Sequence, residues 1–273
     1  MPSLPTDPRR RATLVAAAVA VVCAGVVAVV LTGTLTPAPA PAPAPSATRA
    51  AVPSATTTVT PSPSASARPT DPAAVDAPAS TTIAAASGPS VPVSAAPGGP
   101  ATDQLANPLS SGAPLVFRVV DQRDGWVQVQ LAQRPNGSTG WVPDSAVSLS
   151  TTDYAIVVTE ASNTLDLYRA GEVVDSYPVA TGTGGTPTPT GRFALTELLA
   201  PTNDGYGPYA YGTTAFSDVL NSFGGGPGQI GLHGTDDATS IGTDASHGCI
   251  RMRNADITAL AGRLPLGTPI QVR

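Results

Sequence analysis

The chain contains no lysine: all 14 of its basic residues are arginine. Walker-type nucleotide binding, Schiff-base chemistry and Ser–Lys dyads each depend on a lysine, so these three mechanisms are excluded. The formal charge is only −5, and no basic stripe appears in the second half of the chain. We therefore predict no nucleic-acid partner.

Cysteine and histidine are also scarce, with two residues of each. Cys23 lies inside an apolar run, where a small apolar residue is expected. The other three residues lie close together in the C-terminal half, at His233, His247 and Cys249. Exported proteins usually pair their cysteines. In an exported chain Cys249 would have no cysteine partner, which makes it a candidate reactive thiol.

Only one long hydrophobic run is present, from Ala12 to Leu31, and three arginines precede it at positions 9–11. At 1.5 Å per residue, a helix of roughly 20 residues spans about 30 Å, the thickness of a bilayer core. We predict an uncleaved single-pass anchor in the cell membrane, with the arginines in the cytoplasm and the rest of the chain exported. The alternative is a cleaved signal peptide, whose apolar stretch is usually about 7–15 residues.

Large apolar residues are few between positions 36 and 102, where proline, alanine, serine and threonine dominate. Such a composition buries too little apolar area to offset the entropy of ordering. We predict a disordered linker over 36–102, extended where proline alternates with alanine.

Residues 103–150 are predicted to form a small antiparallel β-barrel. Two tight-turn signals, Asp124-Gly125 and Asn136-Gly137, separate its apolar runs. The run "VQVQL" alternates apolar and polar residues, as a half-buried strand does. The segment resembles the small Src-homology-type barrels that precede catalytic domains in bacterial wall enzymes. Its two tryptophans, Trp126 and Trp141, are expected in the core. The alternative is that they stack on a ligand.

Strands continue through residues 151–273, with a hairpin turn at Ala170-Gly171 and a strand starting near Arg192. A Gly- and Tyr-rich stretch at 201–228 predicts a long loop, either a lid over a cleft or a packed loop. "QIGLH" at 229–233 predicts a short strand. One helix is predicted after Asn254 as the N-cap, with three apolar residues on one face: Ile257, Leu260 and Leu264.

The segment "SHGC" at 246–249 carries the strongest chemical signal. A cysteine attacks carbonyls as a thiolate, so it needs a base or a positive neighbour. His233 and His247 are the two available imidazoles. Gly248 allows close backbone approach, and successive amides here can form an oxyanion hole. Arg251 can bind a carboxylate.

Less reactive interpretations of these residues exist. Cys249 alone can be a small buried hydrophobe. His233, His247 and Cys249 can in principle be three zinc ligands. Arg251 can be a surface ion-pair partner. The Ser-His-Gly-Cys context favours a catalytic cysteine over all of these, and we predict neither a metal nor a cofactor.

The order of "YPVATGTGGTPTPTGRF", "GLHG" and "SHGCIRM" resembles the L,D-transpeptidase catalytic family over about residues 153–273. The resemblance implies a mostly β catalytic domain that transfers acyl groups between peptidoglycan stem peptides. It implies Cys249 as nucleophile and His233 as proton donor and acceptor. Site-shaping roles fall to Gly234, whose carbonyl orients the imidazole, and to Ser246, His247 and Gly248. The amides of His247, Gly248 and Cys249 would line the oxyanion hole, and Arg251 would bind a substrate carboxylate.

Two departures from the family pattern are present. The stretch between His233 and Ser246 is slightly short, and Arg251 stands where some members have asparagine. Neither departure removes a catalytic group.

The resulting prediction is an exported peptidoglycan L,D-transpeptidase that forms 3–3 cross-links through a cysteine thioester, shapes the cell wall and is a carbapenem target. Two alternatives keep the nucleophile: an L,D-carboxypeptidase, and an enzyme that anchors proteins to the wall. A third, of another class, is a non-catalytic wall-binding module. The predicted fold is mainly β with one C-terminal helix. The predicted segments are a cytoplasmic tail (1–11), a transmembrane anchor or signal segment (12–35), a linker (36–102), a barrel-like domain (103–150) and a catalytic domain (151–273).

Overall fold

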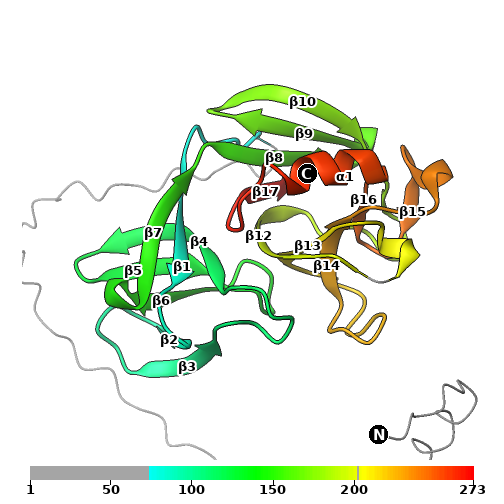
Figure 1. Cartoon of the computed structure of the whole chain (residues 1–273). Coiled ribbons are helices and arrows are strands. Elements are labelled where there is room, and N and C mark those ends of the chain that lie inside the picture. The colour runs from blue at the N-terminus through cyan, green and yellow to red at the C-terminus, as the bar shows by residue number, and fades with distance from the viewer. Residues whose placement is uncertain (1–73, 202) are drawn as a thin grey trace, which may run out of the picture. The chain divides into compact units, whose positions relative to one another are not determined.

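The computed structural model describes residues 74–201 and 203–273, which form two large β-sheets, one two-stranded sheet and one α-helix (Figure 1). The prediction of a mainly β fold with a single C-terminal helix is confirmed for these residues. The predicted tail, anchor and first part of the linker, residues 1–73, lie outside them. Within 74–201 and 203–273, no helix has both the length and the apolar character that a membrane crossing requires.

The first sheet has seven strands, all paired antiparallel, in the order β3-β2-β6-β5-β4-β1-β7. Its strands are β1 (Thr81–Ala86), β2 (Ser90–Ser94), β3 (Ala101–Ala106), β4 (Val116–Arg123), β5 (Trp126–Gln130), β6 (Thr139–Pro143) and β7 (Val147–Thr152). The turn between β4 and β5 lies at Asp124-Gly125, as predicted, with Gly125 at φ 75°.

The prediction that the linker extends to residue 102 is wrong. β1 and β2 lie wholly within 81–102, and β3 begins at Ala101. β1 and β2 are ordered because their small apolar side chains are buried. Ala84 and Val91 are fully buried and belong to the core of the first sheet. β1 pairs with both β4 and β7, so backbone hydrogen bonding supplies stability that the composition alone does not indicate. In the same sheet Trp141 is buried, as expected, and Trp126 is half-buried.

The second sheet has eight strands in the order β10-β9-β8-β17-β12-β13-β14-β16. Its strands are β8 (Tyr154–Thr159), β9 (Thr164–Arg169), β10 (Glu172–Pro178), β12 (Gly191–Leu199), β13 (Ala210–Phe216), β14 (Gln229–His233), β16 (Ile250–Arg251) and β17 (Pro269–Val272). β8 with β17 and β14 with β16 run parallel. A separate parallel pair joins β11 (Thr181–Gly182) to β15 (Asp244–Ser246).

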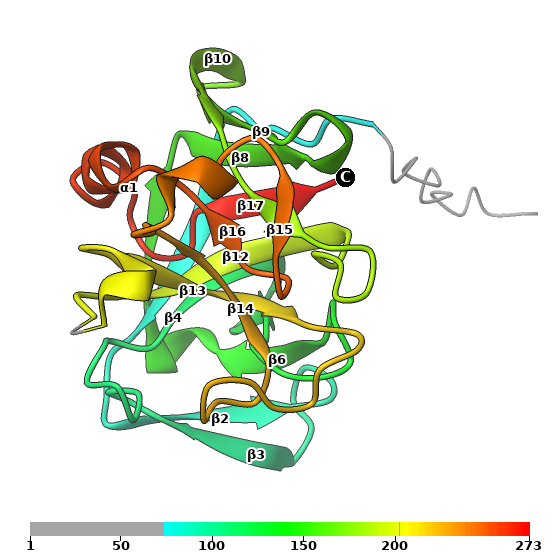
Figure 2. The same cartoon turned by 90° about the vertical axis from the view of Figure 1, so that its right-hand side faces the viewer.

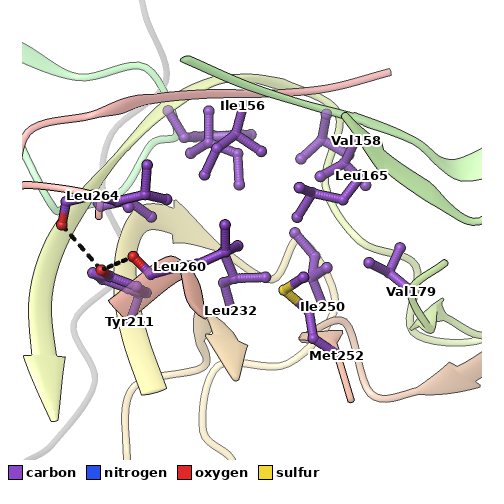
Figure 3. Packing of buried hydrophobic residues seen from close by; sticks show 14 of the residues in the cluster. Ile156, Val158, Leu165, Val179, Tyr211, Leu232, Ile250, Met252, Leu260 and Leu264 are labelled. Carbon is purple, nitrogen blue, oxygen red and sulfur yellow. Dashed lines mark hydrogen bonds between the residues drawn. The ribbon is translucent and has the colours of Figure 1, made fainter. Parts of the chain in front are cut away.

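The core of the second sheet lies between its strands and the helix α1 (Asn254–Ala261) (Figure 3). Ile257 and Leu260 are fully buried and Leu264 is nearly so, which confirms the predicted apolar face. Tyr211 in β13 is fully buried, and its hydroxyl donates to the carbonyls of Leu264 at 3.0 Å and Leu260 at 3.3 Å. These bonds connect β13 to the last turn of α1 and to the segment that follows it. Burial raises the pKa of Tyr211 to about 12.

Two local predictions need correction here. Asn254 is the first residue of α1 rather than its N-cap, which is Arg253. The Asn254 side chain instead accepts a hydrogen bond from the Thr235 amide at 2.9 Å. The stretch 201–228 is not one long loop, because β13 occupies 210–216 within it. The buried side chains of Tyr211, Ala215 and Phe216 hold that strand in the core, although glycines surround it in sequence.

The loop between β5 and β6 contacts the second sheet. Arg134 donates to the carbonyls of Pro227, Ser217 and Leu220 at 2.9–3.0 Å, and its guanidinium lies over the ring of Phe216. Asn136 exchanges hydrogen bonds with the backbone of Phe216, both at 2.8 Å. The loop 217–228 that follows β13 is therefore held by side chains of the first sheet. Figure 2 shows β13 and β14 between α1 and the strands of the first sheet.

Candidate active site

Two short parallel strands, β14 and β16, bring the candidate catalytic residues together. Leu232 pairs with Ile250 and His233 pairs with Arg251. In this register Cys249 lies opposite Gly231. Side chains alternate between the faces of a sheet, so Cys249 and Arg251 share a face with His233. The parallel pairing therefore gathers residues that the sequence keeps far apart.

Gly231 lies next to both the sulfur of Cys249 and the imidazole of His233. A Cβ at this position would stand 3.8 Å from Cys249 Sγ and 3.4 Å from His233 Cδ2. The thiol sulfur and the imidazole ring thus both have an atom within 4 Å of the same point. The Gly231 amide also donates to Cys249 Sγ at 3.4 Å.

His233 is the last residue of β14 and is only 3% exposed. Its Nδ1 lies 2.5 Å from the carbonyl oxygen of Gly234, the contact predicted to orient the ring. A carbonyl accepts only, so Nδ1 carries the proton and Nε2 is free to act as a base. The pKa of His233 is lowered from 6.5 to about 4, chiefly by burial and to a smaller extent by the positive charge of Arg251. The hydrogen bond to the Gly234 carbonyl acts in the opposite direction and raises the pKa. The imidazole is neutral at physiological pH.

Cys249 is half-buried at the edge of β16. Burial raises the pKa of the Cys249 thiol, while the Gly231 amide and the charge of Arg251 oppose that rise. With the imidazole pKa low and the thiol pKa high, the resting pair is a neutral thiol beside a neutral imidazole. A thiolate then forms only if the base takes the proton as the sulfur attacks.

The turn before Cys249 is held by Ser246, which is 1% exposed. Its hydroxyl donates to the carbonyl of Cys249 at 2.5 Å and accepts from the amide of Gly248 at 3.0 Å. Gly248 has φ +114°, and a Cβ there would lie 3.0 Å from Ile230 Cδ1, so only glycine fits without strain.

This turn corrects one prediction about the oxyanion hole. The Gly248 amide already donates to Ser246, so it is not available to a tetrahedral intermediate. The amides of His247 and Cys249 are the remaining candidates of the three. The Gly-Thr-Pro segment packs against the same turn: the Thr183 amide donates to the Ser246 carbonyl at 3.0 Å.

His247 is exposed, and its ring stacks on Phe223, with centroids 4.8 Å apart and planes at 27°. Arg251 is half-buried, and its Nε has no hydrogen-bond partner among the described residues. Binding of a substrate carboxylate by Arg251 stays a prediction.

A cavity of about 290 Å³ contains the candidate site. Cys249 and His233 line it, together with residues that the motif did not indicate, among them Tyr206, Phe223, Gln229 and Glu197. Tyr206 lies against the imidazole of His233, with ring centroids 4.5 Å apart. The Gly- and Tyr-rich composition of 201–228 was the available signal for this wall. Of its tyrosines, Tyr211 belongs to the core and Tyr206 to the cavity.

The zinc interpretation gains no support from the geometry. Among the residues that the structure describes, no group of three or more His, Cys, Asp and Glu side chains could hold a metal ion. His247 faces Phe223, whereas His233 contacts Tyr206.

Comparison with known proteins identifies the family of the part of the chain that forms the second sheet. Residues 152–272 match the YkuD family, described as the L,D-transpeptidase catalytic domain. The YkuD protein of Bacillus licheniformis is 35% identical over 122 residues, covering 45% of this chain and 67% of that protein. The chain belongs to the L,D-transpeptidase family. The family relative YqjB of Bacillus subtilis is 30% identical over 134 residues, covering 44% of this chain and 71% of that protein.

A solved L,D-transpeptidase from Mycobacterium smegmatis aligns with this chain at 20% identity and a TM-score of 0.36, covering 59% of this chain and 90% of that one. Residues 152–272 therefore form an L,D-transpeptidase catalytic domain, which is an acyltransferase domain. The roles of individual side chains in this chain remain predictions, for which the geometry above supplies the physical basis.

Proposed function

We propose that the protein is an exported peptidoglycan L,D-transpeptidase that forms 3–3 cross-links through a thioester on Cys249. The observation that carries the proposal is that the thiol and the imidazole both lie next to Gly231 and line one cavity. A neutral imidazole with a free Nε2 has the lone pair that accepting a proton from a thiol requires. No cofactor is needed for this chemistry.

In the first half-reaction, Cys249 Sγ attacks the carbonyl carbon of the L-centre of diaminopimelate in the donor stem, and the thiol proton passes to His233. A tetrahedral oxyanion forms and accepts hydrogen bonds from backbone amides near Cys249. The carbon–nitrogen bond to the terminal D-alanine then breaks. His233 returns the proton to the departing amine, which leaves a thioester on the enzyme.

In the second half-reaction, the side-chain amine of a neighbouring stem attacks the thioester. A new amide bond forms, the carbon–sulfur bond breaks, and the proton lost by the amine returns through His233 to the thiol. In this proposal Arg251 binds a carboxylate of a stem peptide as a charge-assisted partner. Tyr206 covers the imidazole and limits its contact with water.

The test is product analysis after incubation of the protein with a disaccharide-tetrapeptide. The proposal predicts a 3–3 linked dimer and free D-alanine, and neither product with Cys249→Ala. Tripeptide monomer without dimer would identify an L,D-carboxypeptidase, and acyl transfer only to an added protein amine would identify a wall-anchoring enzyme. Glycan binding that survives Cys249→Ala, with no thiol-dependent product, would identify a non-catalytic wall-binding module.

We also propose that the run at 12–35 anchors the protein in the cell membrane, with residues 103–273 on the outer side. Cell fractionation followed by protease treatment of intact protoplasts tests this. The proposal predicts full-length protein in the membrane fraction, with its C-terminal part accessible to protease. Release of a shortened chain into the medium would instead indicate a cleaved signal peptide.

A further inference from the structure

A second cavity, of about 370 Å³, adjoins the candidate active site on the side of the first sheet. Its walls come from both sheets: Leu109 and Phe117 from the first, Thr196 and Phe216 from the second. The two cavities share three lining residues, which form the border between them: Glu197, Pro227 and Gln229. A ligand in the second cavity therefore adjoins the cavity that contains Cys249.

Glu197 is the one carboxylate on this border. Of the described residues that line either cavity, it is the only acidic or basic side chain apart from His233. His233 is neutral at physiological pH because its pKa is about 4. Glu197 is thus the one opposite charge that a cation meets among the side chains that line these two cavities.

The position of the carboxylate is set by residues of both sheets. A Cβ at Gly212 would stand 2.8 Å from Glu197 Oε1, so the missing side chain of Gly212 provides room for the carboxylate over β13. Glu197 Oε2 accepts a hydrogen bond from the hydroxyl of Ser111, in the segment between β3 and β4. The first sheet therefore orients a charge beside the active site of the second.

We propose that Glu197 binds the ammonium group of the incoming acyl acceptor, a specificity role that rests on the function proposed above. An alkyl amine has an ordinary pKa near 10.4, so the acceptor arrives protonated, and the ammonium releases that proton to water before the neutral amine attacks the thioester. A transpeptidase must accommodate an acceptor stem while the donor stem is attached to the cysteine, and a carboxylate at the border gives the acceptor amine a place to bind. Holding the amine beside the thioester also supplies the positioning that favours transfer over hydrolysis.

The experiment measures binding, so it does not depend on turnover. Calorimetry on the Cys249→Ala protein compares a stem tetrapeptide whose diaminopimelate amine is free with the same peptide acetylated on that amine. A charge-assisted hydrogen bond predicts roughly tenfold or more tighter binding of the free amine. The preference should disappear in Cys249→Ala/Glu197→Gln and weaken in Cys249→Ala/Ser111→Ala.

Glu172→Gln is the matched control, because Glu172 is an exposed glutamate in β10, at the opposite end of the sheet from β14 and β16. It should leave the preference unchanged. Equal binding of both peptides to the parent, or a preference that persists in the Glu197→Gln protein, would overturn the inference. If the wild type forms no cross-links but the amine preference depends on Glu197, the proposed function fails and the ammonium site stands.

Discussion

The ring of Tyr206 lies against the imidazole of His233, with their centroids 4.5 Å apart and their planes at 43°. The contact joins a residue of the Gly- and Tyr-rich stretch to the end of β14. It contributes to the burial that lowers the pKa of His233, and so connects the wall of the cavity to the protonation of the candidate base.

Replacing Tyr206 with alanine is expected to raise the pKa of His233 from about 4 toward its ordinary 6.5, because water then reaches the ring. Titration of the imidazole by NMR measures the shift. Tyr206→Phe is the matched control: it keeps the aromatic ring and should keep the low pKa. A pKa unchanged in the alanine variant would show that the other neighbours of His233 suffice to bury it.

The low pKa of His233 also predicts how stability depends on pH. In the unfolded chain the imidazole takes up a proton near pH 6.5, whereas in the folded protein it does so only near pH 4. The unfolded state therefore binds more protons between these values, and stability falls as the pH decreases through that window. The loss is about 3 kcal/mol for a shift of this size. Chemical unfolding at pH 7 and pH 4 should show a smaller decrease in His233→Gln than in the wild type; equal decreases would contradict the assignment.

Ser246→Ala removes two hydrogen bonds that hold the turn before Cys249. Because the Gly248 amide and the Cys249 carbonyl then lose a buried partner, stability should fall by about 1–3 kcal/mol. The rate of Cys249 acylation should fall as well. Ser240→Ala is the control, since Ser240 is also buried and its hydroxyl donates to the Asp237 carbonyl, away from the cysteine. It should lower the melting temperature without slowing acylation; equal slowing by both variants would assign the effect to general destabilisation.

Arg134→Ala is expected to loosen the loop 217–228, because three carbonyls of that loop lose their donor. Amide hydrogen exchange of peptides from 217–228 should accelerate, and acylation should slow because Phe223 and Pro227 line the active-site cavity. Arg123→Ala serves as the control: Arg123 contacts Trp141 and Asp121 within the first sheet. If exchange in 217–228 is unchanged by Arg134→Ala, the first sheet does not support the active-site loop.

Local patterns in the sequence predicted parts of both large sheets and the helix. The turns at Asp124-Gly125 and Ala170-Gly171 join β4 to β5 and β9 to β10. Both glycines have positive φ, the conformation that such turns require. The strand at 229–233 and the apolar face of α1 are also confirmed. Each of these features depends on neighbours in sequence, which is why a single chain reveals them.

Features that depend on distant partners could not be predicted in this way. β1 and β2 consist largely of small residues, and only their pairing with later strands gives them order. The Ser111–Glu197 and Arg134–Pro227 contacts join residues that no local periodicity relates. The Gly248 amide was predicted to be free, but the hydroxyl two residues earlier occupies it. The motif thus indicated which residues gather, but not which of their hydrogen bonds are already made.

The most direct test of the central claim is the intact mass of the protein after incubation with a carbapenem, with the adduct located by peptide mapping. A reactive Cys249 thiol beside a general base predicts one covalent adduct in the wild type, located on Cys249, and none in Cys249→Ala. An adduct of the same mass on Cys249→Ala, or an unmodified wild type that still forms cross-links, would contradict the account.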